Sequence, residues 1–263
     1  MRIARFEVNG TIRRGVVRDD TITEIEGDIF SEFEEASTTH QLVAVRLLVP
    51  IVPSQMYGPG VNFVAHLSPA DGAGGQVRMV PTPQPWHKGV NALNNPGDAI
   101  VIPFDSANGI QYEGECLAVI GAPTRRVSPE EAWHRILGYT CGNDVSERNW
   151  QRNDNSYWRG KGSDTFAPVG PWIDTEFDPK LGGDMVVRVN GNEVQRANTA
   201  NMHFDFGELI SYISQQVTLR PGDIVWSGTT GRPENLEPGD TVEVEIESIG
   251  VLSNPVEAEP HQL

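Results

Sequence analysis

Short alternating segments separated by tight turns constrain the fold of this chain most strongly. Residues 2–8 and 11–18 alternate apolar and polar side chains around an Asn-Gly dipeptide at positions 9–10, which favours a two-residue hairpin. A second Asn-Gly dipeptide, at positions 190–191, joins two further strand-like segments within residues 184–195. Strands and helices do not alternate along the chain, so we predict a mainly β, mixed-sheet fold with a few peripheral helices.

The N-terminal region has the pattern of a small separate unit. Prolines at positions 50 and 53 interrupt the chain where the strand pattern changes, which indicates a boundary. We therefore predict a small N-terminal β domain over residues 1–52 and a larger domain over residues 53–263. Within the first of these, residues 31–45 are expected to hold a short helix.

Two helix starts are recognisable. Residues 128–131 form a capping box with proline at the first helical position, and Gly138 is predicted to end this helix. A second helix is predicted to begin within residues 205–208. Its apolar face would consist of Leu209, Ile210 and Ile213.

Charge and composition exclude several classes of protein. The chain has 263 residues, of which 38% are apolar, and its formal net charge of −16 repels a nucleic-acid backbone. No apolar run approaches membrane-spanning length, and the first residues lack the apolar stretch of a secretory signal. Cys116 and Cys141 lie in apolar, strand-like surroundings and are too few for a disulfide framework. We therefore expect a cytoplasmic protein without a nucleic-acid or membrane partner.

Residues 67–85 are rich in glycine, proline and alanine and follow neither a strand nor a helix pattern. A loop of this length in a compact enzyme is usually a lid or a binding loop. A surface insertion is the alternative interpretation.

An acidic pair on an apolar strand carries the clearest chemistry. Glu113 and Glu115 are two residues apart, so they are expected to point to the same face of a strand over residues 112–120. Two adjacent carboxylates repel each other, and their burial would require a compensating cation. The alternating glutamates of residues 243–247 lie opposite apolar residues and are expected to form a hydrated strand face. An acidic pair alone is therefore weak support, and the apolar continuation at 116–120 is what favours a metal site.

A third carboxylate follows the apolar segment 137–141. Asp144 lies just past this segment, where loop ligands are often found, with a turn or helix cap as its alternative role. Together with Glu113 and Glu115 it would form an all-oxygen site, which suits Mg²⁺ or Mn²⁺, with Ca²⁺ as a further candidate. Zinc suits the site less well because no histidine or cysteine spacing accompanies these acids. A bound cation would also reverse the local field and admit an anionic substrate.

An ordered set of motifs resembles the fumarylacetoacetate hydrolase family over residues 55–257. No single motif is decisive, but the ordered set is specific. The motifs are Gly60-Val61-Asn62-Phe63 with His66, Tyr112-Glu113-Gly114-Glu115, Gly138-Tyr139-Thr140 leading to Asn143-Asp144-Val145-Ser146 with Arg148 and Gln151, Trp158 to Phe166, Gly170-Pro171-Trp172, Thr218-Leu219, Pro221-Gly222-Asp223-Ile224, Ser227-Gly228-Thr229, and Gly239-Asp240 leading to Ile249-Gly250.

This resemblance implies a mixed β-sandwich roll in a catalytic domain over residues 53–263, preceded by the small N-terminal β unit. It also implies a homodimer with one metal ion per subunit. The resemblance assigns the metal ligands to Glu113, Glu115 and Asp144, contact with the metal-bound substrate or water to Lys161 and Gln151, and contact with the substrate carboxylate to Thr229.

Structural roles are the alternatives for several of these residues. Lys161 would otherwise be a surface lysine paired with Asp164. Gln151 would otherwise be a structural amide, and Thr229 a turn residue. Arg148 is expected to be structural, binding backbone or an acid.

The chain departs from the hydrolases of this family after His66. Those enzymes have a glutamate three residues later, and the His–Glu pair activates the attacking water, whereas here the position holds Pro69. Asp71 is the nearby acid that would have to substitute for the glutamate. A histidine without an orienting acid is a poorer general base, and a loop histidine without a role is the alternative. His87 and His203 are expected to serve packing or to lie at the surface.

These observations predict a metal-dependent enzyme that acts on a small 2-oxo acid. In the first interpretation it hydrolyses a carbon–carbon bond of an acylpyruvate-type substrate, with His66, Lys161 and Gln151 as catalytic residues. Decarboxylation or keto–enol isomerisation competes with this interpretation, because a metal that chelates a 2-oxo acid stabilises the enolate without an activated water. A family member recruited to specialised biosynthesis and a non-catalytic binding protein are the remaining alternatives.

Overall fold

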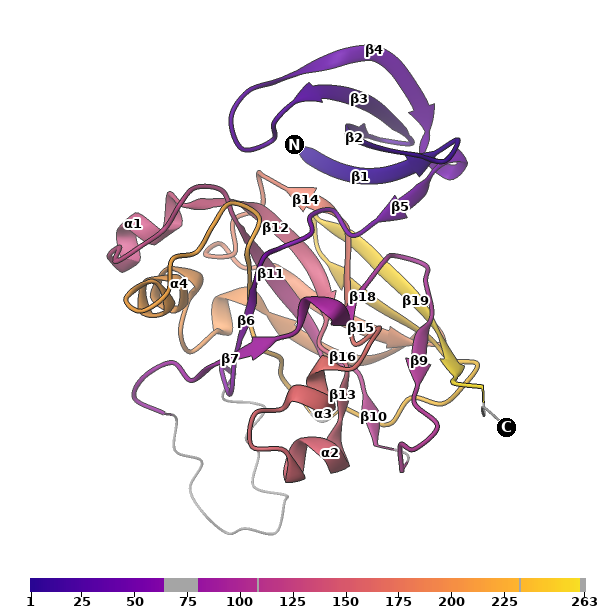
Figure 1. The fold of residues 1–263 in the computed structure, drawn as a ribbon, viewed down its shortest axis with the longest axis vertical. Helices are drawn as coiled ribbons and strands as arrows, with labels where there is room; N and C mark the ends of the chain where they lie inside the picture. Colours follow the sequence, from indigo (N-terminus) through magenta and orange to yellow (C-terminus); the bar gives the residue numbers. More distant parts are fainter. Residues whose placement is uncertain (64–79, 108, 232, 261–263) are drawn as a thin grey trace.

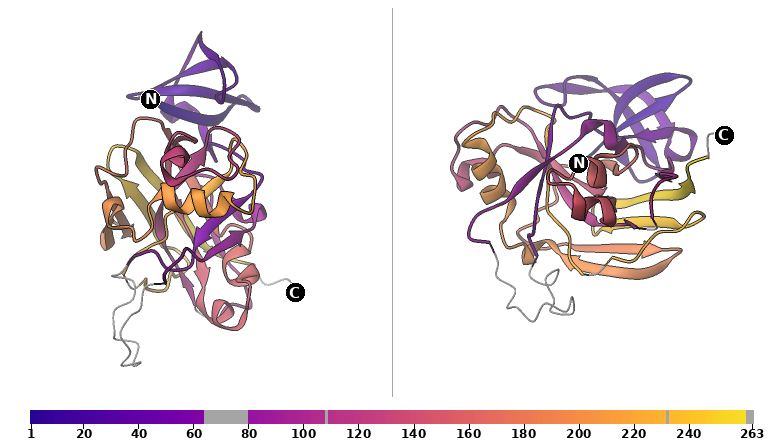
Figure 2. Two further views of the ribbon diagram at one scale, coloured as in Figure 1. Left: turned by 90° about the vertical axis from the view of Figure 1, so that its left-hand side faces the viewer. Right: turned by 60° about the horizontal axis from the view of Figure 1, so that its bottom comes forward.

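Strands dominate the structure, a computed structural model that describes residues 1–63, 80–107, 109–231 and 233–260 (Figure 1). The N-terminal strands lie at one end of the molecule, and the remaining strands and the helices form the larger part beneath them (Figure 2). The mainly β class with few peripheral helices is confirmed.

A long mixed sheet runs from the N-terminal strands to the strands that carry the acidic residues. Its order is β4 (Phe33–Gln41), β3 (Thr21–Gly27), β2 (Thr11–Arg18), β1 (Arg2–Val8), β14 (Ala167–Asp174), β12 (Ile136–Asn143), β11 (Gly114–Ile120), β17 (Ile224–Trp226), β6 (Met56–Pro59) and β7 (Pro85–Lys88), with β5 (Arg46–Leu48) beside β1 and β8 (Leu93–Asn94) beside β14. Within the described ranges, β17 pairs with β6 and β14 with β8 in parallel, and the other pairs in this sheet are antiparallel.

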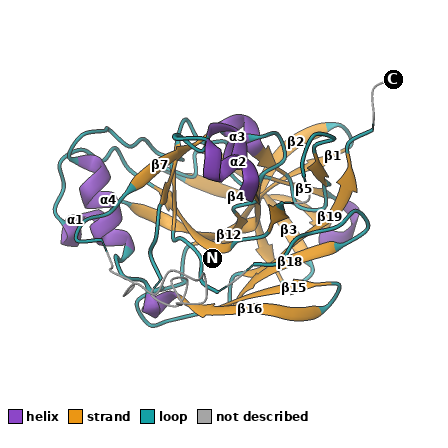
Figure 3. Ribbon diagram, turned by 90° about the horizontal axis from the view of Figure 1, so that it is seen from below, coloured by secondary structure: helices purple, strands orange, loops and turns teal. Residues whose placement is uncertain are grey.

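A second sheet packs against the first. Its order is β16 (Asn192–Asn198), β15 (Asp184–Val189), β18 (Thr241–Ile246), β19 (Gly250–Ala258) and β9 (Ile100–Ile102), and a separate pair joins β10 (Ile110–Gln111) to β13 (Ser146–Glu147). Figure 3 shows β15, β16 and β18 as a layer beside β12. A Cβ atom on Gly114 of β11 would lie 2.3 Å from Val187 of β15 and 3.3 Å from Val244 of β18. The two layers therefore meet closely, and the expected β-sandwich is confirmed.

The α-helices lie at the edges of the sheets (Figure 3). They are α1 (Pro129–Trp133), α2 (Arg148–Asn153), α3 (Trp158–Gly162) and α4 (Phe206–Ser214), and short 3₁₀ turns cover Leu42–Ala44, Val90–Ala92 and Thr199–Asn201. The predicted apolar face of α4 is buried. In the part of the chain that the structure describes, no helix combines the length and apolar character needed to cross a bilayer.

Both predicted helix starts are confirmed, but the predicted end of the first helix is wrong. In α1 the Ser128 hydroxyl accepts a hydrogen bond from Glu131 N at 3.2 Å, while Glu131 Oε2 accepts one from Ser128 N at 2.9 Å. This helix ends at Trp133, and Gly138 lies inside β12. A Cβ atom on Gly138 would lie 2.5 Å from the carbonyl oxygen of Asp174, so the glycine permits the close approach of β14.

The expected short helix within residues 31–45 is also wrong. Residues 33–41 form β4, which pairs antiparallel with β3, and only residues 42–44 make a single 3₁₀ turn. Residues 37–39 are serine and two threonines, and β-branched side chains favour extended backbone. Pairing with β3 adds the backbone hydrogen bonds that an isolated short helix would lack.

The division between residues 1–52 and 53–263 stays a prediction. The N-terminal strands have a small core of their own, formed by Ala4, Phe6, Val17 and Ile22. However, β1 also pairs with β14, with Arg2 opposite Asp174 and Ile3 opposite Ile173. The N-terminal strands therefore have a core of their own and also extend the main sheet.

Buried Asp223 fixes β6 beside the centre of the main sheet. Its Oδ1 accepts hydrogen bonds from Ser54 N at 3.1 Å, from Ser54 Oγ at 2.6 Å and from Gln55 N at 3.1 Å. Its Oδ2 accepts hydrogen bonds from Arg220 N at 2.7 Å and from Gln55 Nε2 at 2.8 Å. Because β7 pairs with β6, this carboxylate also holds β7 in place.

Candidate metal and substrate site

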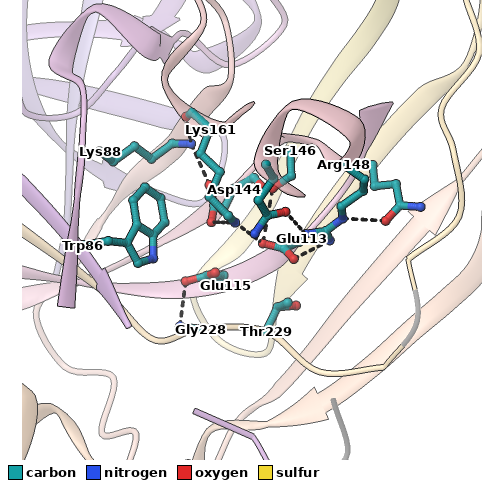
Figure 4. A network of polar contacts seen from close by, with 12 residues as sticks. Trp86, Lys88, Glu113, Glu115, Asp144, Ser146, Arg148, Lys161, Gly228 and Thr229 are labelled. Carbon is teal, nitrogen blue, oxygen red and sulfur yellow. Dashed lines mark hydrogen bonds and ion pairs between the residues drawn. The ribbon is translucent and has the colours of Figure 1, made fainter. Parts of the chain in front are cut away.

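Three buried carboxylates meet where β11 begins and β12 ends (Figure 4). Glu113, Glu115 and Asp144 are 4%, 2% and 2% exposed, and one oxygen of each lies within 4.8 Å of the chosen oxygens of the other two. Among the described residues, these three form the only group of acidic, histidine or cysteine side chains close enough to share a metal ion. The structure thus brings together the three acids that the sequence singled out.

The pairing of β11 with β12 produces this convergence. Glu115 lies opposite Gly142, so the start of one strand coincides with the end of the other. Asn143 Oδ1 accepts a hydrogen bond from Glu113 N at 2.9 Å, and Asp144 N donates to Glu113 O at 2.8 Å. One side-chain and one backbone hydrogen bond therefore hold Glu113 beside the end of β12, next to Asp144.

Three basic side chains surround these acids (Figure 4). Lys161 Nζ lies 2.6 Å from Glu113 Oε2 and also forms an ion pair with Asp144 Oδ2. Lys88 Nζ lies 2.6 Å from Asp144 Oδ1, and Arg148 forms an ion pair with Glu113 Oε1. Both oxygens of Glu113 and both oxygens of Asp144 therefore face a cationic group.

Glu115 differs from the other two acids. Within the described ranges its hydrogen bond comes from the backbone N–H of Gly228, which lies 2.7 Å from Oε2. Burial and the negative charges of Asp144 and Glu113 raise the pKa of Glu115 well above its ordinary value. Burial also acts to raise the pKa of Glu113. Lys161 and Arg148 lower it by more than burial raises it, so the pKa of Glu113 lies below its ordinary value. A cation bound next to Glu115 would offset the repulsion by Asp144 and Glu113 and would favour the ionised form of Glu115.

The donor set fits a hard divalent cation. Metal–oxygen distances of about 2.0–2.6 Å place two ligand oxygens up to about 4–5 Å apart, which is comparable with the observed separations. Carboxylates are also the ligands that Mg²⁺, Mn²⁺ and Ca²⁺ prefer. The Lys161 ammonium already lies between Glu113 and Asp144, which shows that this space accommodates positive charge.

Lys161 is a buried member of this cluster, so the alternative of a surface lysine paired with Asp164 is wrong. Its residue exposure is 5%, and Asp164 instead accepts a hydrogen bond from Asn91 Nδ2 at 2.9 Å. Burial lowers the pKa of the Lys161 ammonium, but Asp144 and Glu113 raise it by more, so the pKa lies above its ordinary value. Lys161 therefore carries a positive charge into the site.

Arg148 orients the amide of Gln151. Arg148 Nη1 donates to Gln151 Oε1 at 2.7 Å, and Arg148 Nε donates to Gln111 Oε1 at 2.7 Å. The same guanidinium binds Glu113, so the expected structural role of Arg148 as a partner of an acid is observed. Because the oxygen of Gln151 is occupied, its amide nitrogen is the end that can donate to a ligand in the pocket that it lines.

Thr229 also lines this pocket, but its hydroxyl is engaged within the protein. Thr229 Oγ1 donates to Gly114 O at 3.0 Å and accepts from Gln195 Nε2 at 2.7 Å. A hydroxyl has one proton, so this group cannot also donate to a carboxylate. Contact with a substrate carboxylate would need the Thr229 backbone N–H or a rearrangement of this network, and the role stays a prediction.

Lys88 and Trp86 of β7 complete the site, and sequence reasoning missed both. Lys88 is fully buried, and Trp86 is half-buried and lines the pocket. The Lys161 ammonium lies 5.0 Å from the centre of the Trp86 ring, within the range of a cation–π interaction. Strand periodicity places Trp86 and Lys88 on one face of β7, but the sequence of this short strand does not indicate that this face is the inward one.

The pocket over the carboxylates is small, with a cavity volume of about 50 Å³. Residues 59–62 form one wall of it, and Trp86 and Tyr157 lie among the other lining residues.

The remaining predicted residues lie elsewhere or outside the described residues. His66, Asp71 and most of the loop at 67–85 fall within residues 64–79, which the structure does not describe. His87 is exposed and packs edge-on against Tyr57, with ring centres 5.0 Å apart. His203 is exposed beside Phe204, so both histidines take the packing or surface roles expected of them.

Comparison with known families gives two matches. Residues 55–257 match the model of the fumarylacetoacetate (FAA) hydrolase C-terminal family, and residues 1–50 match the Rv2993c-like N-terminal family. The 2,4-didehydro-3-deoxy-L-rhamnonate hydrolase of Sphingomonas sp. (strain SKA58) is 35% identical over 268 residues, which cover 95% of this chain and 94% of the relative.

Two solved structures extend the comparison. The 2-hydroxyhepta-2,4-diene-1,7-dioate isomerase from Mycobacterium marinum has a TM-score of 0.88 and 36% identity, and the match covers 98% of this chain and 99% of the isomerase. The maleylpyruvate hydrolase from Sphingobium sp. SYK-6, in complex with a manganese(II) ion and pyruvate, has a TM-score of 0.81 and 27% identity, and the match covers 99% and 100% of the two chains. These relatives include both hydrolases and an isomerase.

Proposed function

The chain belongs to the fumarylacetoacetate hydrolase family, and on this premise we propose that it is a divalent-metal-dependent enzyme acting on a small 2-oxo acid. The observation that carries the proposal is the convergence of three buried carboxylates in one pocket. Glu113, Glu115 and Asp144 would hold Mg²⁺ or Mn²⁺. The manganese ion in the Sphingobium hydrolase supports this choice, although that ion belongs to the relative.

The charges of the site favour an anionic, chelating substrate. With all six groups ionised, the three carboxylates are balanced by Lys88, Lys161 and Arg148. A bound divalent cation would leave an excess of two positive charges in a buried pocket, which favours an anion. A 2-oxo acid offers a carboxylate and a keto oxygen as adjacent donors, and the pyruvate bound to the Sphingobium relative is such a compound.

The protein side chains then have distinct tasks. When bound, the metal ion supplies electron withdrawal from the keto oxygen of the substrate. The Lys161 ammonium, held by Glu113 and Asp144, presents a positive charge to the negative charge that develops on the substrate oxygen. Gln151, whose oxygen is held by Arg148, directs its amide nitrogen as a donor.

Hydrolysis of a carbon–carbon bond is the first proposed reaction, and keto–enol isomerisation is the second. Hydrolysis is favoured by the two hydrolase relatives. Isomerisation is favoured by the Mycobacterium marinum relative and by Pro69, which stands where the hydrolases of the family have a glutamate. Hydrolysis needs a base that activates water, whereas isomerisation needs only proton transfer beside a stabilised enolate.

Replacing His66 by alanine distinguishes the two reactions. If His66 is the base of a hydrolase, His66→Ala is expected to lower kcat by about 100-fold or more, the range of general-base catalysis. An isomerase that uses another group would lose much less activity. The measurement is steady-state kinetics with acylpyruvates, fumarylacetoacetate and oxaloacetate, each with and without EDTA.

The exposed His87 supplies the matched control, since His87→Ala is expected to leave kcat unchanged. A protein that turns over none of these 2-oxo acids with Mg²⁺ or Mn²⁺ present would contradict the proposed substrate class.

The homodimer expected for the family is likewise a proposal, which light scattering tests.

A further inference from the structure

We propose that Lys88 makes the metal site selective for a small cation such as Mg²⁺ over the larger Ca²⁺, because it holds one oxygen of Asp144. The inference rests on the proposed function, since it assumes that the three carboxylates bind a divalent cation. It assigns a positioning role to a residue that belongs to none of the recognised motifs.

The Lys88 ammonium is fixed by its surroundings. The residue is fully buried at the end of β7, and Nζ donates to Asp144 Oδ1 and to the backbone oxygen of Lys161, at 2.6 Å in each case. The ring centres of Trp86 and Trp226 lie 5.7 and 5.6 Å from Nζ. Figure 4 shows the side chain of Lys88 extending toward Asp144 and Lys161, with Trp86 beside it. Two hydrogen bonds and two indole rings therefore leave this ammonium little freedom to move.

This contact determines how Asp144 can bind a metal. Lys88 pairs with Oδ1 and Lys161 pairs with Oδ2, so both oxygens have a lysine partner. Lys161 has a second partner in Glu113 Oε2 and lines the pocket, so Oδ2 is the oxygen that a cation can reach by displacing a lysine. Asp144 is thus restricted to donating one oxygen.

A ligand restricted to one oxygen discriminates between cations. Mg²⁺ requires near-octahedral geometry at about 2.0–2.1 Å, which single oxygens from separate carboxylates provide. Ca²⁺ takes about six to eight oxygens at 2.3–2.6 Å and commonly binds a carboxylate through both of its oxygens. By preventing Asp144 from binding through both oxygens, Lys88 disfavours Ca²⁺ more than Mg²⁺.

Lys88 also connects Asp144 to α3. Because the same ammonium binds the carbonyl oxygen of Lys161, it fixes the backbone from which the Lys161 side chain reaches the site. Lys88 thereby links the metal ligand Asp144 to the backbone of Lys161. Lys88 itself lines no part of the pocket surface in the described residues, so it acts through these two neighbours.

The test compares Mg²⁺ and Ca²⁺ affinities of the metal-stripped protein by isothermal titration calorimetry. For Lys88→Met we expect the Mg²⁺ affinity to fall by about 10- to 100-fold, the usual effect of losing a residue that supports a metal ligand. The Ca²⁺ affinity is expected to fall much less, so the preference for Mg²⁺ decreases. The ratio of the Mg²⁺ affinity to the Ca²⁺ affinity is informative for two reasons. Loss of the lysine charge affects both divalent cations alike. A general structural defect would lower both affinities in proportion.

Lys180→Met is the matched control, since Lys180 is exposed and contacts Trp133 away from the carboxylates. An unchanged ratio in Lys88→Met would overturn the role of Lys88 while leaving the metal site intact. A wild-type protein that binds neither cation would instead overturn the proposed function. If Lys88→Met does not fold, Lys88→Gln replaces it, because its shorter, uncharged side chain holds Oδ1 less firmly and should also lower the preference for Mg²⁺. Preference of the wild type for Ca²⁺ over Mg²⁺ would contradict the inference whichever variants fold.

Discussion

Glu115→Gln is expected to abolish measurable metal binding and to lower kcat/KM by at least about 1,000-fold. The several kcal/mol that a bound metal contributes to a transition state correspond to about tenfold in rate per 1.4 kcal/mol. Glutamine has the shape of glutamate, and its oxygen can still accept the hydrogen bond from Gly228 N. The change therefore removes a metal ligand with little disturbance of the packing.

The stability of the same variant is expected to differ from that of the wild type only when metal is present, or to exceed it when metal is absent. Glu115 is buried, forms no ion pair among the described residues and is repelled by Asp144 and Glu113. Without metal, Glu115→Gln should therefore melt at the same temperature as the wild type or higher, whereas only the wild type gains stability from added Mn²⁺. Differential scanning calorimetry with and without Mn²⁺ measures both effects.

Glu243→Gln is the control for loss of a single negative charge, because Glu243 lies on β18, away from the site. Retention of the Mn²⁺-induced stabilisation in Glu115→Gln would contradict the assignment of Glu115 as a ligand. A large loss of stability in metal-free Glu115→Gln would contradict the view that burial and repulsion make the charge of Glu115 unfavourable.

Lys161→Met is expected to destabilise the metal-free protein by about 3–5 kcal/mol, the usual effect of removing one partner from a buried ion pair. Glu113 and Asp144 would then face each other across a buried space without the cation that now separates them. A bound Mn²⁺ replaces the missing charge, so Mn²⁺ should raise the melting temperature of this variant by more than it raises that of the wild type.

Activity should not recover with stability in this variant. Removal of one group that stabilises developing negative charge typically lowers kcat by about 100- to 1,000-fold, and excess Mn²⁺ does not restore that group. Urea denaturation and steady-state kinetics at saturating Mn²⁺ separate the two effects, with Lys180→Met as the exposed control. Full activity of folded, Mn²⁺-loaded Lys161→Met would remove Lys161 from the mechanism.

The three carboxylates could be found from the sequence because local rules place them. Strand periodicity over residues 112–120 predicts that Glu113 and Glu115 share a face, and an apolar segment ends just before Asp144. The strand β11 itself begins at Gly114, two residues later than predicted, so Glu113 lies just before it. The register that brings the two strands together is long-range, and it was the ordered family motifs, not periodicity, that linked Asp144 to the acidic pair.

Lys88 shows what such rules leave out. A lysine on a short strand is ordinarily exposed, and its burial here depends on contacts with Asp144 and Trp226, which lie far along the chain. The hydroxyl of Thr229 is a similar case, since its partner Gln195 comes from a strand of the second sheet.

The two errors in secondary structure also have tertiary causes. Residues 33–41 became a strand because the edge of β3 was available for pairing. The local sequence around Gly138 is typical of a helix end. In the structure Gly138 lies in β12, where Asp174 O leaves no space for a side chain. In both cases a neighbouring strand decided the outcome.

The central claim is that three buried carboxylates bind one hard divalent cation that a 2-oxo acid can chelate. Isothermal titration of Mn²⁺ into the EDTA-stripped protein, in the presence and absence of oxalate as a substrate mimic, tests it most directly. We expect one Mn²⁺ per chain and tighter binding with oxalate. Absence of saturable Mn²⁺ binding in the folded protein, with or without oxalate, would contradict the claim.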